Sequence, residues 1–135
     1  MADNYPSFDR LEIRKEYTDK INGIFYRDNL PWTASSSIIH PQVFVRPKDS
    51  YHWSKFQNVS RMSLHTIDGI MRFGVKGKYS PDKAPYKETL MKNKGYSFQQ
   101  NPDSENDWWL IKPIDLGEIV REIRDIEPIL LKKKN

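Results

Sequence analysis

Basic and aromatic side chains are concentrated in the middle of this 135-residue chain. Residues 41–80 contain seven lysines and arginines against two acids, a net charge of +5, although the formal net charge of the whole chain is only +4. The same stretch includes the run KDSYHWSKFQNVSRM, residues 48–62, which has three aromatic rings. Proteins that bind single-stranded nucleic acid use this combination, because cations contact phosphates and rings stack on bases.

Strand geometry predicts which of these side chains share a surface, because successive residues of a strand point to opposite faces. In residues 70–78 the apolar positions 71, 73 and 75 are expected to face the core, which leaves Arg72, Lys76 and Lys78 on the outward face. Such a face is expected to bind single-stranded DNA or RNA. The predicted binding residues are Arg46, Lys48, Tyr51, His52, Trp53, Lys55, Arg61, Arg72, Lys76, Lys78 and Trp109.

The adjacent tryptophans, Trp108 and Trp109, belong to this prediction for a geometric reason. In a strand, one of the two must point away from the core unless helices cover both faces of the sheet. We expect one ring to be part of the core and the other to anchor a partner. The sequence alone leaves open which ring has which role.

An acidic protein is the alternative partner for the same surface. Trp, Tyr and Arg are the usual anchors of protein interfaces, so these residues also fit a small inhibitor or an immunity-type protein. A basic strand face can also serve only to protect a sheet edge from aggregation. The sequence favours a non-catalytic binding module, with nucleic acid as the first expected partner and an acidic protein as the second.

A metal-dependent nuclease is the third function considered. Asp68 and Lys78 share part of the acid-and-lysine arrangement of one nuclease core, but Lys76 stands where a carboxylate ligand of Mg²⁺ is needed. Asp68 is instead expected to be a turn residue. The histidines, at positions 40, 52 and 65, lack the spacing of paired metal ligands. We therefore predict no catalytic residue, no metal and no cofactor.

The absence of cysteine excludes disulfides and thiolate chemistry. No apolar run reaches the roughly 20 residues that a membrane helix requires, and the first residues do not form a secretory signal. A cytoplasmic protein without a membrane partner is therefore expected.

Hydrophobic periodicity and turn residues predict one α+β domain, a mostly antiparallel sheet of about five strands with three helices in the order α-β-β-β-α-β-β-α. Asp68-Gly69 predicts a type I′ hairpin turn, Asp115 is expected to cap the last helix, and Pro128 to end it. The domain is expected to span 9–131, with a flexible segment at 1–8 and a basic tail at 132–135. The predicted helices cover 9–27, 85–94 and 115–128, and the predicted strands cover 37–46, 61–67, 70–78, 96–100 and 108–113.

Overall fold

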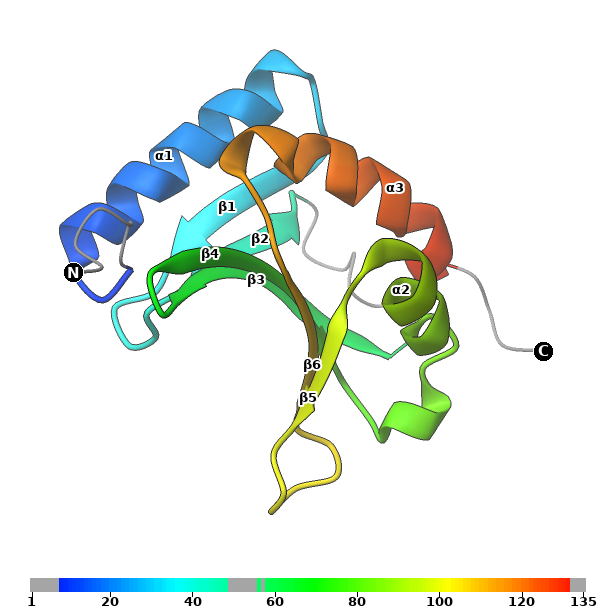
Figure 1. The fold of residues 1–135 in the computed structure, drawn as a ribbon. Coiled ribbons are helices and arrows are strands. Elements are labelled where there is room, and N and C mark those ends of the chain that lie inside the picture. The colour runs from blue at the N-terminus through cyan, green and yellow to red at the C-terminus, as the bar shows by residue number, and fades with distance from the viewer. Residues whose placement is uncertain (1–7, 49–55, 57, 132–135) are drawn as a thin grey trace.

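The computed structural model describes residues 8–48, 56 and 58–131, and in this part of the chain three α-helices pack on a six-stranded antiparallel sheet (Figure 1). The strand order is β1-β2-β3-β4-β6-β5. The predicted α+β class and element order are confirmed, with one strand more than expected. The elements are α1 (Leu11–Arg27), β1 (Trp32–Ser36), β2 (Val43–Pro47), β3 (Val59–Ile67), β4 (Ile70–Gly77), α2 (Lys87–Lys94), β5 (Ser97–Gln100), β6 (Trp108–Pro113) and α3 (Ile119–Leu131).

The additional strand arises where the sequence predicted one extended segment over 37–46. The chain instead forms the β1–β2 hairpin, and residues 37–42 are its connection. Ile38 and Ile39, whose β-branched side chains suggested a strand, are each 82% exposed in this connection. The buried side chain of Arg14 donates a hydrogen bond to the carbonyl of Ser37, and tertiary contact of this kind outweighs local strand propensity.

The β3–β4 hairpin forms where it was predicted. Asp68 and Gly69 have φ angles of 53° and 76°, the two positive values that a type I′ turn requires. The pairs Ile67–Ile70 and Leu64–Phe73 fix the register on either side of the turn. The strand after this turn therefore presents the alternating residues that the sequence predicted.

The last helix differs from the prediction at both ends. The side chain of Asp115 makes no capping hydrogen bond, and a 3₁₀ turn (Leu116–Glu118) precedes α3. Pro128 lies within α3, which continues to Leu131. A proline costs a helix one backbone hydrogen bond, and the fully buried Leu130 holds the final turn against the core and offsets that loss.

The core lies between the sheet and the helices, and α1 and α3 lie along the same side of the sheet (Figure 1). Trp108 is 0% exposed in this core and packs against Tyr86 and Phe98. Its ring lies so close to Gly77 that a Cβ added there would overlap it. Other fully buried members of the core are Ile21, Val43, Val45, Met62, Leu64, Phe73, Val75, Leu90, Leu110, Ile119, Ile126 and Leu130.

A buried ion cluster joins α3 to β6 on the helix-covered side. The Glu122 carboxylate lies 2.9 Å from Lys112 Nζ and accepts a hydrogen bond of 2.7 Å from the Tyr96 hydroxyl. Burial raises the pKa of Tyr96, and the neighbouring carboxylate raises it further. Because these charges are paired and hydrogen-bonded, the cluster positions α3 on the sheet without leaving a buried charge unpaired.

The described chain begins at a core residue. Phe8, the last residue of the segment expected to be flexible, is fully buried and packs edge-on against Tyr17, with 5.1 Å between ring centroids. This contact ties the start of α1 to the core.

None of the described helices, including the 17-residue α1, is both long enough and apolar enough to cross a membrane.

Candidate binding site on the helix-free face

The face of the sheet opposite the helices carries cations and aromatic rings. We call it the helix-free face, because all described helices pack on the other side. Strand alternation and register place its residues: Phe44 pairs with Ser63, Ser63 with Gly74, and Gly74 with Ile111. Its side chains include those of Phe44, Arg46, Arg61, Ser63, His65, Arg72, Lys76, Trp109 and Ile111.

Arg61 lies at the centre of the helix-free face, between aromatic rings from two other strands. Its Cζ is 5.5 Å from the ring centroid of Phe44 on β2 and 5.5 Å from that of Trp109 on β6. Lys76 on β4 has its Nζ 5.8 Å from the Trp109 ring. Cations within about 6 Å of an aromatic ring are attracted to its negative face, so these contacts bind four strands together on this side.

Trp109 extends from β6 across β4 because Gly74 has no side chain. A Cβ built on Gly74 would lie 2.8 Å from Trp109 Cε3, closer than real side chains approach each other. Beyond Gly74 the indole reaches His65 on β3, with 5.3 Å between ring centroids. The absence of a Cβ at position 74 therefore allows one tryptophan to cover parts of two neighbouring strands.

Burial under this layer changes the ionisation of His65. Burial, together with the positive charges of Arg72 and Arg61, lowers the pKa of His65 to about 4. The imidazole is therefore neutral near pH 7. It presents one donor and one acceptor nitrogen rather than a positive charge.

Lys76 is less available to a ligand than its neighbours on the helix-free face. Its Nζ lies 2.8 Å from Asp107 Oδ1, and this hydrogen bond is the main cause of the lowered pKa of Asp107. Arg46 is exposed, and the hydrogen bond of 2.7 Å that Arg72 donates goes to the neutral Ile67 carbonyl rather than to a carboxylate. Arg46 and Arg72 are therefore the better candidates for contacting an anion.

The structure brings several predicted residues together. Arg46, Arg61, Arg72, Lys76 and Trp109 lie on the helix-free face, and Trp108 is the tryptophan in the core. Lys48 and Lys78 are exposed directly after β2 and β4, with Lys78 Nζ 5.5 Å from the ring of Tyr79. The remaining predicted residues, Tyr51, His52, Trp53 and Lys55, lie outside the described residues.

Sequence reasoning missed Phe44, Ser63 and the packing role of His65. Phe44 follows the same alternation as Arg46, but an apolar residue in a strand is by default expected in the core. Ser63 is a small polar residue between two core positions, Met62 and Leu64. Strand alternation alone places it on the opposite face, so the signal that could have found it lies in the sequence.

The described residues do not assemble the nuclease arrangement. Asp68 and Lys78 flank opposite ends of the eight-residue β4, and a strand of that length spans about 25 Å. Within the described part of the chain, no group of three or more His, Asp or Glu residues could hold a metal ion.

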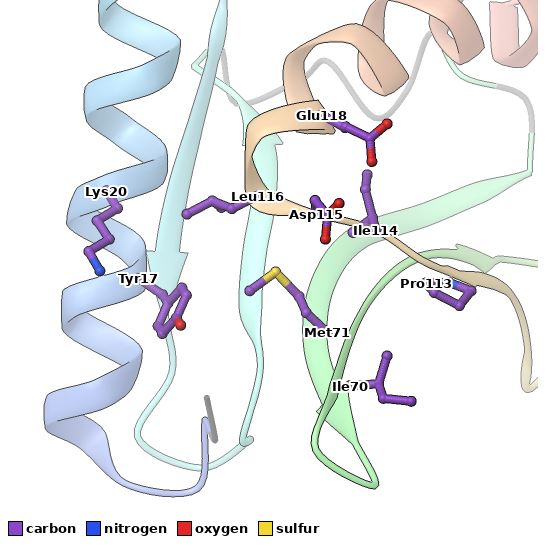
Figure 2. A pocket seen from close by; sticks show the side chains of 9 residues that line it. All are labelled: Tyr17, Lys20, Ile70, Met71, Pro113, Ile114, Asp115, Leu116 and Glu118. Atoms are coloured by element: carbon purple, nitrogen blue, oxygen red, sulfur yellow. The ribbon is translucent and has the colours of Figure 1, made fainter. Parts of the chain in front are cut away.

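A pocket of about 460 Å³ lies elsewhere, where α1, the start of β4 and the segment before α3 meet (Figure 2). Tyr17 and Lys20 come from α1, and Met71 lies opposite them (Figure 2). The volume is within the range of small-ligand sites. However, Lys20 Nζ is already paired with Glu16 Oε1 at 3.0 Å. None of the predicted binding residues lines the pocket.

Comparison with known proteins identifies a fold but not a family. No family model matches the sequence, and no curated protein matches it. A solved structure with a similar fold is that of YbjN from E. coli, provisionally described as a transcription regulator. The two chains are 11% identical, with a TM-score of 0.51 over 92% of this chain and 90% of YbjN. At this identity the likeness shows a shared fold and no more.

Proposed function

We propose that this protein is a non-catalytic binding module whose helix-free face binds single-stranded nucleic acid. The observation that carries the proposal is the position of Arg61 between Phe44 and Trp109, 5.5 Å from each ring, on a face that no described helix covers. Rings on an open sheet are the platforms on which RNA-binding domains stack bases, and neighbouring cations contact the backbone.

The cations around the rings support an extended anionic ligand. Arg46 lies near the end of β2, Arg72 near the start of β4 and Lys78 directly after β4, on the two strands that neighbour β3 and its Arg61. Charges spread over several strands fit a polymer with regularly spaced phosphates better than they fit a small molecule. A binding rather than a catalytic role also agrees with the provisional description of YbjN, which has a similar fold, as a transcription regulator.

The test is a measurement of affinity for a fluorescent single-stranded 15-mer by anisotropy, over a range of salt concentrations. Arg46→Ala and Arg72→Ala should each weaken binding about threefold to tenfold at low salt. Each should also reduce the slope of log K against log salt by about 0.7 for every phosphate that is no longer neutralised. Arg121→Ala is the matched control, because Arg121 is exposed on α3 and its removal changes the net charge equally.

Two results would contradict the proposal. Absence of affinity for any DNA or RNA oligonucleotide at low salt would exclude nucleic acid as the ligand. An equal decrease of affinity in Arg121→Ala would mean that net charge, and not the helix-free face, determines binding. If wild type instead captures an acidic protein through Arg46 and Arg72, the helix-free face is a protein interface.

A further inference from the structure

Three alternate residues of β3 have buried polar atoms that lack hydrogen-bond partners among the described residues. These atoms are Arg61 Nε, Ser63 Oγ and His65 Nε2. All three side chains point to the helix-free face, and Ser63 is 0% exposed. Buried polar groups are almost always hydrogen-bonded, because an unpaired group forfeits its interaction with water. A row of three on one strand therefore requires an explanation.

The indole of Trp109 lies at the edge of this row. It occupies the space above Gly74, which is the register partner of Ser63, and it contacts both His65 and Arg61. No glycine is needed at this position for backbone reasons, since Gly74 lies within β4 and has no positive φ. Its missing side chain instead leaves a flat space that a planar group of two fused rings can fill.

We propose that the space above Gly74 is a base-binding slot and that Trp109 covers it in the unbound protein. When a purine of a single strand binds, the indole moves off Gly74 and the base takes its place, with its edge toward Ser63 and His65. The inference rests on the proposed function and specifies its ligand chemistry. Purines match the slot because they are bicyclic and planar like indole, and their edges carry both donors and acceptors.

The polar row has the groups needed to recognise such an edge. Arg61 Nε is a donor, and the hydroxyl of Ser63 both donates and accepts. The buried Nε2 of His65 borders the space above Gly74. A Cβ built on Gly74 would lie 3.3 Å from this nitrogen. Base recognition of this kind would pair the three atoms that lack partners, whereas the indole has only one N–H donor and no acceptor.

The decisive experiment compares three probes of equal length: dA12, dT12 and a 12-unit abasic deoxyribose-phosphate strand. Wild type should bind dA12 about tenfold more tightly than the abasic strand, and more tightly than dT12. Ser63→Ala should remove about threefold to tenfold of the preference for dA12 over the abasic strand and leave abasic binding unchanged. Ser97→Ala is the matched control, an exposed serine on the same face whose partner in the sheet is Ile111.

A second measurement detects the movement of the Trp109 indole directly. The protein is labelled with 5-fluorotryptophan, and the ¹⁹F resonance of Trp109 is assigned from Trp109→Phe. That resonance should shift with dA12 and remain in place with the abasic strand. Ser63→Ala should melt at or above the wild-type temperature, because the hydroxyl it removes has no partner among the described residues of the unbound protein.

The outcomes separate this inference from the proposed function. Equal binding of dA12 and the abasic strand overturns the slot while the electrostatic proposal stands. A base preference that Ser63→Ala leaves intact, or a Trp109 resonance that does not respond to dA12, also overturns the slot. Absence of binding to all three probes overturns both proposals.

Discussion

Two adjacent tryptophans of β6 occupy opposite faces of one sheet, and their surroundings differ in kind. Trp108 lies on the helix-covered face, where its Nε1 donates a hydrogen bond of 2.5 Å to the Tyr79 carbonyl and its ring is enclosed by apolar groups. Trp109 lies on the helix-free face, in contact with Arg61, Lys76 and His65.

The two faces also differ in how they treat polar atoms. Around Trp108 the ring's single donor is paired, whereas around Trp109 three buried polar atoms have no partner among the described residues. Stability alone favours paired or apolar groups in buried positions. Folding alone therefore does not account for the three unpaired atoms beside Trp109, and the proposed base slot would give them partners.

The largest expected effect comes from truncating each tryptophan in turn. Trp108→Ala should lower the free energy of unfolding by about 3–5 kcal/mol, because it leaves a large cavity in the core and an unpaired Tyr79 carbonyl. Trp109→Ala should lower the free energy of unfolding by clearly less, since its ring is only partly buried. Urea unfolding of both variants, together with oligonucleotide binding, measures the contrast.

Binding should follow the opposite order. Trp109→Ala should change oligonucleotide affinity, because the indole lies on the binding face and occupies the space above Gly74 that a base would enter. Trp108→Leu, which keeps an apolar group in the core, should retain wild-type affinity once the variant is shown to be folded. Equal destabilisation by the two alanine substitutions would make the helix-free face a second core and would remove the distinction between the faces.

An intermediate effect is expected from pH, through His65. The folded protein keeps this imidazole neutral down to about pH 4, whereas the unfolded chain protonates it near pH 6.5. The unfolded state therefore binds the extra proton first, and stability should fall as pH decreases from about 6.5 to 4 and level off below that. Protonation of His65 should lower the free energy of unfolding by about 3 kcal/mol over this whole pH range.

His65→Phe isolates this effect, because a ring remains beside Trp109 while the titration is removed. The difference in unfolding free energy between wild type and His65→Phe should change by about 3 kcal/mol between about pH 6.5 and pH 4. The same difference for His40→Gln, a histidine in the exposed β1–β2 connection, serves as the comparison. A constant difference for His65→Phe would mean that water reaches the imidazole, and that Trp109 with its neighbours does not bury it.

Local chemistry explains what the sequence could predict. The Asp68-Gly69 turn and the alternation of β4 each depend on residues close in sequence, and the structure has both as expected. The cluster on the helix-free face joins β2, β3, β4 and β6, and its contacts depend on strand order and register. Those are set by the packing of the whole sheet, so Phe44 could not be matched to Arg61 and Trp109 from the sequence alone.

The smallest expected effect belongs to the turn that joins β3 to β4, at the edge of both faces. Asp68 has a φ of 53°, a left-handed conformation that asparagine tolerates as well as aspartate does. Asp68→Asn should therefore change the free energy of unfolding by less than about 0.5 kcal/mol and leave oligonucleotide affinity unchanged. Asp68→Val is the matched comparison and should be clearly less stable, because a β-branched residue is strained at positive φ. A folded Asp68→Asn protein that no longer binds would instead place the carboxylate in the functional surface and extend that surface from the helix-free face to the hairpin turn.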